Sequence, residues 1–287
     1  MAAGRDLLDA GAAIPPRRVW YYNLEDPADE LQRRIRALVL YHGMDWADLG
    51  DRLYVDSGRD QALTVAKSTR DGVKIHAPVV HAVRSTIIDN NIDVLIVDPF
   101  VDSHLVAENS NDEIKIVARL WSQIANDCDC SIELVHHTRK LNGQEASAED
   151  SRGGSAFVGV ARSVRALSGV SEEDAQKQNL PGEHWAYFYI TDGSKANLAP
   201  PSSRQGRWFK KVSVDVQNAT IDLPSDQVGI ATRYTPPVIE VVSDADACLK
   251  VQLALTAQDR RCRVSLQSRG LWVGHIVAEA MNVDVKT

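Results

Sequence analysis

The 287-residue sequence lacks the features that mark several large classes of protein. No uncharged apolar run approaches the roughly 18 to 20 residues that a membrane-spanning helix needs. The opening residues, MAAGRDLLDAG, contain no apolar signal core, so we expect a protein that is not secreted. Internal repeats and low-complexity tracts are also absent. With 44% hydrophobic and 25% charged residues, the composition predicts a soluble globular protein.

Cysteine is scarce, and its spacing does not indicate a metal site. No paired spacing typical of zinc occurs among the four cysteines, Cys128, Cys130, Cys248 and Cys262. We therefore expect reduced thiols in a cytoplasmic protein. Cys128 and Cys130 lie beside a predicted strand and are expected to be packing residues.

Positive charge is not in excess either. The formal net charge of −7 argues against a protein that coats nucleic acid through bulk electrostatics. Any DNA contact would have to come from a ring of subunits or from local basic clusters. Two such clusters are Arg204, Arg207, Lys210 and Lys211, and then Arg260, Arg261, Arg263 and Arg269. Most runs of this kind are simply solvated surfaces.

The most informative stretch that is present is IDVLIVDPF, at residues 92–100. A short apolar run closed by a turn residue predicts a buried central strand of a parallel sheet. Asp98 then lies at the carboxyl end of that strand, where open α/β sheets bind their ligands. A carboxylate in this position suits the coordination of Mg²⁺ beside a nucleotide phosphate.

Strands and helices alternate along the first two thirds of the chain. Helical spacing of apolar residues occurs at 31–42, 77–90 and 114–124. Strands are expected at residues 17–24, 92–100, 130–138, 185–197 and 208–216. The strand at 130–138 is expected to be buried, and the one at 208–216 to be an edge strand. This order predicts an α/β fold with a mainly parallel, twisted sheet covered by helices on both faces.

Polar residues follow the ends of four predicted strands, at Glu25, Asp98, His137 and the turn from Asp192 to Lys195. In a parallel sheet, such ends converge on one edge. Together these residues offer a base, a metal-binding carboxylate and a group that senses phosphate. Arg162, which follows the SRGGS segment by one short helix, adds a cation.

Five segments in this order resemble one family. They are YYNLEDP with its LQRRIRAL helix, DVLIVDPF, DCSIELVHHTRK, SRGGSAFVGVAR, and SKAN followed by RWFKK. The set is similar to the RepA-type AAA-family ATPases, which are RecA-fold hexameric helicases that replicate plasmid and phage DNA. The resemblance covers residues 3–216. It implies a RecA-like three-layer sandwich, ATP and Mg²⁺ as ligands, single-stranded DNA as a partner, and a homo-hexameric ring.

The resemblance also implies a role for each site residue. Glu25 matches the catalytic glutamate that polarises the attacking water, and Asp98 matches the aspartate that holds Mg²⁺. His137 matches the histidine that senses the γ-phosphate. Arg162 matches an arginine finger that acts on the neighbouring subunit's nucleotide. Lys195 occupies a turn where related helicases place a further cation.

The sequence differs from this family at one position near Lys195 and resembles it in one polar loop. Relatives often carry a second cation two residues after the position of Lys195, where this sequence has Asn197. The polar segment 139–151 corresponds to the loop region that faces DNA.

One expected motif is missing from these 287 residues. The family uses a phosphate-binding G-x-x-x-x-G-K-[ST] loop, and no such sequence occurs here. MAAGRDLLD, at residues 1–9, resembles the end of the helix that follows that loop. We therefore expect the first strand, the loop and its lysine to lie upstream of Met1 or to have been lost. The missing strand is expected in the interior of the sheet.

Three segments are expected. They are an ATPase core at 1–223, a linker at 224–243 that contains three prolines before residue 240, and a module at 244–287. The last contains LWVGHIVAEAMNVDV and resembles the opening of a helix-turn-helix or winged-helix domain, ending before a recognition helix.

Three functional interpretations stay open. The first is a RepA-type ATPase and helicase that is inactive as the chain stands. The second is a P-loop-less pseudoenzyme that binds DNA or joins a ring as an interaction protein. The third is an α/β enzyme acting on a small molecule through Glu25 and His137.

Loss of an interior strand would expose apolar surface. We therefore expect the purified chain to be unstable or to aggregate. Light scattering and a thermal melt test this expectation. A monodisperse species with a cooperative melt would contradict it.

Overall fold

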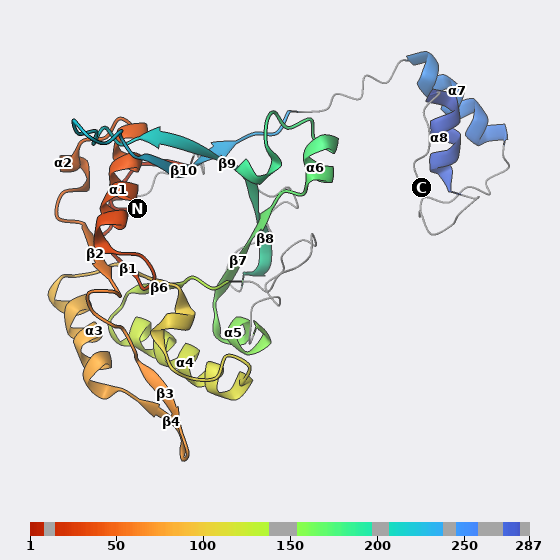
Figure 1. Ribbon diagram of the computed structural model, residues 1–287. Helices are drawn as coiled ribbons and strands as arrows, with labels where there is room; N and C mark the ends of the chain where they lie inside the picture. The colour runs from red at the N-terminus through yellow and green to blue at the C-terminus, as the bar shows by residue number, and fades with distance from the viewer. Residues whose placement is uncertain (9–14, 138–153, 197–206, 238–244, 258–271, 282–287) are drawn as a thin grey trace. The chain divides into compact units, whose positions relative to one another are not determined.

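A computed structural model describes the chain except for residues 9–14, 138–153, 197–206, 238–244, 258–271 and 282–287 (Figure 1). The chain divides into two compact units, Met1–Pro237 and Val238–Thr287. The first unit contains a parallel sheet, an antiparallel sheet and a small two-stranded sheet. The expected polar loop at 139–151 lies outside the described residues.

The parallel sheet contains four strands in the order β2-β1-β5-β6. Their bounds are Val19–Asn23 for β1, Leu53–Ser57 for β2, Val94–Asp98 for β5 and Ser131–Leu134 for β6. Asn23 is paired with Ser57 on one side and with Asp98 on the other, so these strands end at the same edge. The sequence-based prediction of a parallel sheet around Asp98 is confirmed.

Helices cover both faces of this sheet. They are α1 (Ala28–Tyr41), α2 (Trp46–Leu49), α3 (Ala77–Asp89) and α4 (Asn111–Asp127). Buried residues of α3 and α4 form one core with Trp20, Leu95 and Val97. On the other face, Val39 of α1 packs with Val19 and Val94. Strand side chains alternate between these two cores, and the three layers fit a RecA-like domain.

Strand β6 departs from expectation in two ways. The sequence suggested a buried strand, but β6 alternates between exposed and half-buried residues, because it lies at the edge of the sheet. It is also hydrogen-bonded directly to β5, with Val94 opposite Ser131 and Val97 opposite Leu134. No gap separates β5 from β6, and the free edge of β6 among the described strands leaves the missing strand a prediction.

The second sheet of the first unit is antiparallel, in the order β10-β9-β8-β7. Its strands are Ser163–Gly169 (β7), Tyr187–Ala196 (β8), Arg207–Asp215 (β9) and Gln227–Tyr234 (β10). Three short helices lie next to these strands in the sequence: α5 (Gly154–Val160) before β7, and α6 (Glu172–Lys177) and η3 (His184–Ala186) between β7 and β8. Ala37 of α1 packs with Val228 and Ile230 of β10, which joins this sheet to the helical layer.

Strand β10 lies within residues 224–243, for which the prolines predicted a linker. Its alternating residues Val228 and Ile230 are buried, so the first part of this range forms a strand, and the boundary between the units follows Pro237, inside the range predicted as a linker. Strand β9 was expected at an edge. It has a neighbour on each side, because β10 pairs with it from Gln227 to Tyr234.

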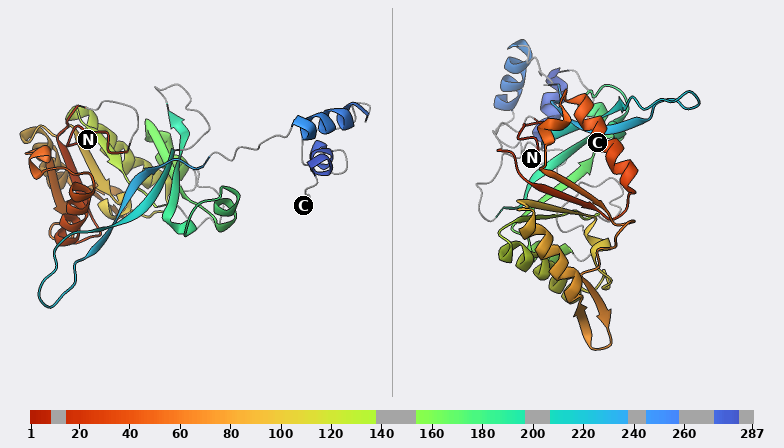
Figure 2. Two further views of the ribbon diagram at one scale, coloured as in Figure 1. Left: turned by 90° about the horizontal axis from the view of Figure 1, so that it is seen from above. Right: turned by 90° about the vertical axis from the view of Figure 1, so that its left-hand side faces the viewer.

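The small sheet is a hairpin of β3 (Ala66–Thr69) and β4 (Gly72–Ile75). The segment after Asp98, which begins with η1 (Phe100–Ser103), runs beside it. Val65 N donates to Ser103 O at 2.9 Å, and Ser68 N donates to Leu105 O at 3.0 Å. In Figures 1 and 2 the hairpin projects beyond α3 and α4.

In the second unit the structure describes two helices, α7 (Ala245–Ala257) and α8 (Val273–Met281). Helix α8 occupies the segment expected to be an early helix of the C-terminal module. The residues between α7 and α8 lie mostly outside the described ones, so the winged-helix interpretation stays a prediction. Among the described residues of the whole chain, none of the helices has the length and apolar character needed to span a membrane.

Leu95 tests the core of the parallel sheet, because it is fully buried against α3 and α4. Leu95→Ala should lower the free energy of unfolding by about 2 to 5 kcal/mol, since it removes buried methyl groups and leaves a cavity. Ile88→Ala is the control, because Ile88 is 59% exposed and its truncation should cost no more than about 0.5 kcal/mol. Urea denaturation measures both, and equal unfolding midpoints for the two variants would contradict the assigned core.

Candidate functional site

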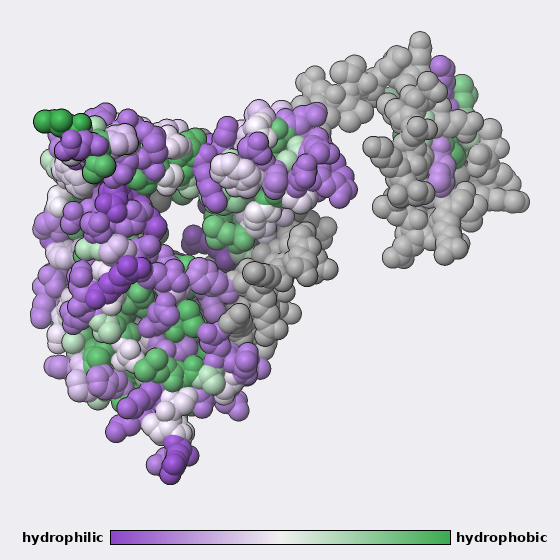
Figure 3. All heavy atoms as spheres, in the orientation of Figure 1, coloured by the Kyte–Doolittle hydropathy of each residue, from purple (hydrophilic) through white to green (hydrophobic). Residues whose placement is uncertain are grey.

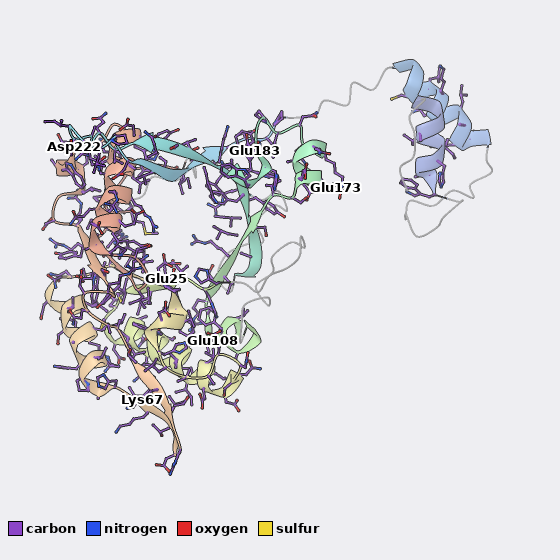
Figure 4. The ribbon with its side chains drawn as sticks, viewed as in Figure 1. Glu25, Lys67, Glu108, Glu173, Glu183 and Asp222 are labelled. Atoms are coloured by element: carbon purple, nitrogen blue, oxygen red, sulfur yellow. The ribbon has the colours of Figure 1, made fainter. Side chains whose placement is uncertain are left out.

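Three of the predicted site residues meet at the carboxyl edge of the parallel sheet. Glu25 follows β1 by two residues, Asp98 ends β5, and His137 follows β6 by three. Figure 4 shows Glu25 near the end of its strand. Strand β5 lies between the other two strands, so Asp98 stands between the segments that carry Glu25 and His137.

Glu25 and His137 are close enough to interact directly. Glu25 Oε1 lies 3.6 Å from His137 Nε2, and their side chains are 52% and 65% exposed. The contact becomes an ion pair only when the imidazole is protonated. A carboxylate and an imidazole that are both open to solvent can reach a bound ligand and exchange protons with it.

Asn23 fixes the turn that carries Glu25. Its side chain is buried, and its Oδ1 accepts hydrogen bonds from Glu25 N at 3.0 Å and Asp26 N at 2.7 Å. Arg59 Nε donates to Glu25 O at 2.7 Å from the loop after β2. Leu24 N donates to Asp98 O at 2.6 Å, so the two site-bearing turns are also joined through the backbone.

Tyr21 holds the carboxylate of Asp98. The phenol donates to Asp98 Oδ2 at 3.0 Å and accepts from Asn23 Nδ2 at 2.9 Å. Burial raises the pKa of Tyr21 to about 12, and the charge of Asp98 acts in the same direction, although the hydrogen bond from Asn23 opposes them. The phenol therefore stays neutral and can donate over the whole physiological pH range.

The site residues predicted from the sequence did not include Tyr21, Asn23 or Arg59. A signal for the first two was available, because Tyr21 and Asn23 alternate with the buried Trp20 and Tyr22 along β1. The period of two places them on the same face as Asp98 in the neighbouring strand. Arg59 comes from a loop, and only the folded structure brings it to Glu25.

An aromatic cluster lies behind the site and connects its segments. Phe100 is fully buried, and its ring centroid lies 4.7 Å from that of His104, 5.7 Å from His136 and 4.9 Å from Phe157. Phe100 N also donates to Val135 O at 2.6 Å. Burial lowers the pKa of His104 to about 4, with a further contribution from His136, so this imidazole is neutral. The cluster fixes the turn after Asp98 against the residue before His137.

Arg162 and Lys195 lie elsewhere, at one end of the antiparallel sheet. Arg162 is exposed between α5 and β7, and its guanidinium has no ion pair with any residue that the structure describes. The turn predicted from Asp192 to Lys195 is part of strand β8 instead, and the backbone of Lys195 there pairs with Val164 in β7, two residues after Arg162. The side chain of Lys195 lies outside the described part of the chain. Among the described side chains, no hydrogen bond or ion pair joins Arg162 to Glu25, Asp98 or His137, and the roles of Arg162 and Lys195 stay predictions.

The segment Glu25-Asp26-Pro27 suggests a helix start capped by an aspartate, but Asp26 does not cap α1. The N-cap position is Pro27, and it has no side-chain cap. Asp26 Oδ2 instead accepts from Arg34 Nη1 at 2.7 Å, two turns into the helix. The arginine draws the carboxylate along the helix surface, away from the backbone amides of the first turn.

The donor set at this edge fits Mg²⁺ better than a metal bound by the protein alone. Within the described ranges there is no group of three or more His, Cys, Asp or Glu side chains able to hold a metal. Mg²⁺ takes one or two carboxylates and completes its shell with water and phosphate oxygens. Asp98 meets this requirement, since Tyr21 orients its carboxylate and engages only Oδ2. A Gly-rich loop for the phosphates is not supplied by these residues.

Residues 1–143, about half of the chain, match a protein-family model described as an AAA domain. The match supports an AAA-type P-loop ATPase family. It includes Glu25, Asp98 and His137, whereas Arg162 and Lys195 lie beyond it. The AAA family implies nucleotide binding, and in this AAA-type domain the three residues lie where an open α/β sheet binds its ligand.

Tyr21 provides a test of the geometry around Asp98. Because its pKa is raised to about 12, Tyr21 should ionise well above the ordinary value of 10.0, as should Tyr22, whose pKa is also about 12. Stability from the neutral phenol is fully present below pH 10 and is lost as the pH rises toward 12. Absorbance titration of tyrosinate should therefore show late-ionising groups in the folded protein.

Tyr21→Phe should remove one late-ionising group and leave that of Tyr22. The variant should also lower the free energy of unfolding by about 1 kcal/mol, because the Asp98 carboxylate and the Asn23 amide each lose a partner. Tyr41→Phe is the control, since its ring is 47% exposed. A titration curve of Tyr21→Phe that matches the wild type above pH 11 would contradict the proposed hydrogen bonding.

Proposed function

We propose that this protein is a RepA-type ATPase that couples ATP hydrolysis to movement along single-stranded DNA in a hexameric ring, in plasmid or phage replication. The observation that carries the proposal is the meeting of Glu25, Asp98 and His137 at one sheet edge inside the AAA match. The order of the five resembling segments along the chain supports the more specific RepA assignment.

Each residue has a role that its position permits. Glu25 is the general base that takes the proton of the attacking water, because its exposed carboxylate is held on a turn fixed by Asn23 and Arg59. Asp98, oriented by Tyr21, would hold Mg²⁺, which neutralises phosphate charge when bound. His137 donates to the terminal phosphate and senses its presence.

The 3.6 Å contact between Glu25 and His137 gives the sensor a way to act. Residues 138–153, which include the expected DNA-facing loop, directly follow His137 in sequence. A phosphate that draws His137 away from Glu25 would therefore move the chain at the start of that loop. Loss of the phosphate would allow the pair to form again.

Arg162 completes the proposed ring mechanism. It is exposed at the end of β7, where it can reach the nucleotide of an adjacent subunit and stabilise transition-state charge. Lys195 is assigned a supporting role there, since its backbone pairs near the same strand end. Both assignments require an assembled ring.

A second candidate function is a subunit that binds DNA or joins a ring without hydrolysing ATP. The absence of a G-x-x-x-x-G-K-[ST] sequence from the 287 residues favours it, because those loop amides and the lysine normally hold the β- and γ-phosphates. ATP hydrolysis by this chain that is lost in Glu25→Gln would exclude the second candidate, and hydrolysis only after a G-x-x-x-x-G-K-[ST] segment is restored upstream of Met1 would support the first.

The decisive experiment measures ATP binding and hydrolysis by the chain, alone and with a G-x-x-x-x-G-K-[ST] segment restored upstream of Met1, with and without single-stranded DNA, beside Glu25→Gln in the active form. The variant should lose hydrolysis by a factor of about 100 to 10,000 while retaining nucleotide binding, because the amide cannot accept the proton of water. Glu183→Gln removes one carboxylate from a surface position outside the candidate site and should hydrolyse ATP as the wild type does.

Two outcomes would contradict the proposal. Hydrolysis that survives Glu25→Gln would show that Glu25 is not the base. A chain that binds DNA but neither binds nor hydrolyses ATP even with a G-x-x-x-x-G-K-[ST] segment restored upstream of Met1 would favour the second candidate.

A further inference from the structure

The hairpin β3–β4 places two lysines directly opposite each other. In its antiparallel register, Lys67 faces Lys74 and Ser68 faces Val73. Directly opposed residues of an antiparallel pair lie on the same face, with Cβ atoms about 4.5 to 5.5 Å apart. Like charges in this position are destabilising, so the arrangement is unfavourable unless an anion lies between or beside them.

The chain does not neutralise this charge in the part that the structure describes. Lys67, Lys74 and Arg70 at the tip are all exposed, and none of them forms an ion pair with a described residue. Asp71 is the only acidic residue between Ala66 and Ile75 in the sequence. The tip is hydrophilic on the face seen in Figure 3, and Figure 4 shows Lys67 on the projecting strand.

The opposite face of the hairpin is fixed to the protein. Ala66 is fully buried, and Val73 and Ile75 pack against the core beneath the parallel sheet. Ser68 Oγ on this face donates to Glu113 Oε2 at 2.6 Å, which ties β3 to α4. The alternation of side chains therefore directs Lys67 and Lys74 outward from a firmly attached base.

An exposed leucine lies beside the lysines. Leu105 forms a parallel bridge with Lys67 and is 67% exposed. Lys74, Lys67 and Leu105 therefore form a row of neighbouring residues, one from each of three adjacent backbone segments. Two amino groups next to an aliphatic surface suit a ligand that has both phosphates and apolar planar groups. A single strand of nucleic acid offers both, because its bases are unstacked and accessible.

The hairpin is joined to the Asp98 segment through the backbone. Leu105 N donates to Ala66 O at 2.8 Å, and Val65 N donates to Ser103 O at 2.9 Å. Only seven positions separate Asp98 from Leu105, and they include the buried Phe100 of the aromatic cluster. A ligand on the hairpin would therefore contact a segment that continues directly to the site.

We propose that the outer face of the β3–β4 hairpin, formed by Lys67, Lys74 and Leu105 with Arg70 at the tip, binds the backbone and a base of single-stranded DNA. The choice of DNA among polyanions rests on the proposed function. The hairpin is a contact additional to the loop region 139–151. It lies within an acidic protein, so the binding is local and does not require a positive net charge.

A structural role for the lysines predicts a different result. Charged residues on exposed strands prevent edge-to-edge aggregation, and a charge of either sign serves that purpose. Lys67→Glu/Lys74→Glu keeps two like charges in the same positions and reverses only their sign. The double variant should match the wild type in its light scattering and its thermal melt, yet lose DNA binding.

The experiment measures binding of fluorescein-labelled oligo(dT) to the full chain by anisotropy, without nucleotide, over a range of salt concentrations. The double variant should bind about tenfold more weakly or worse. Its slope of log affinity against log salt should fall by about 1.4, since each phosphate contact on a single strand contributes about 0.7. Asp71→Asn should bind more tightly than the wild type, because it removes the acidic charge at the tip.

Two further variants separate the contributions. Leu105→Ser should weaken binding about fivefold or more without changing the salt slope, because it removes an apolar contact to a base and no charge. Lys177→Glu is matched to Lys67→Glu in net charge, but Lys177 lies in α6 and already pairs with Glu173. It should leave binding unchanged.

Any of three results would overturn the inference. The first is wild-type affinity and salt slope in the double variant. The second is an equal loss of DNA binding in Lys177→Glu and Lys67→Glu. The third is displacement of oligo(dT) by polyglutamate at the same charge concentration. ATP hydrolysis is measured separately on the same proteins. A chain that hydrolyses no ATP even with the phosphate-binding segment restored, but shows the predicted losses in DNA binding, would refute the ATPase proposal and leave the hairpin assignment supported.

Discussion

The site depends on the parallel pairing of β1 with β5, which places Asn23 beside Asp98 at the same edge. From that register follow the hydrogen bonds that hold the carboxylates, since Tyr21 reaches Asp98 and Asn23 reaches both Tyr21 and the Glu25 turn. A shift of one residue would turn Tyr21 and Asn23 to the opposite face. The buried strand residues of both cores resist that shift, so packing on each face of the sheet maintains the chemistry at its edge.

The same segment links the site to more distant parts of the first unit. After Asp98 the chain enters a buried aromatic cluster at Phe100 and then runs beside the β3–β4 hairpin. Phe157 of α5 joins this cluster, and α5 leads to Arg162. The segment that follows Asp98 therefore contacts His136 on one side and the base of the hairpin on the other. Such contiguous packing provides a route for coupling nucleotide state to DNA contacts.

Particular residues show why some of this was predictable. Four consecutive apolar residues before Asp98 predicted a central strand, and the helical spacing at 77–90 predicted α3, because local patterning and burial agree there. The edge position of β6 and the existence of β10 were not predicted, because an edge position and a proline-flanked strand depend on distant partners. Asp26 was misassigned as a helix cap because Arg34, two turns away, competes for its carboxylate.

The sequence by itself determined the α/β class, the strand ends that carry Glu25, Asp98 and His137, and the resemblance to the RepA-type ATPases. These depend on short-range patterns and on residue order, which are independent of how strands pair. Tertiary structure alone decided that β6 pairs directly with β5, that Tyr21 and Arg59 support the site, and that Lys67 stands opposite Lys74. Register and long-range contacts arise from the simultaneous packing of many side chains, and no local stretch specifies them.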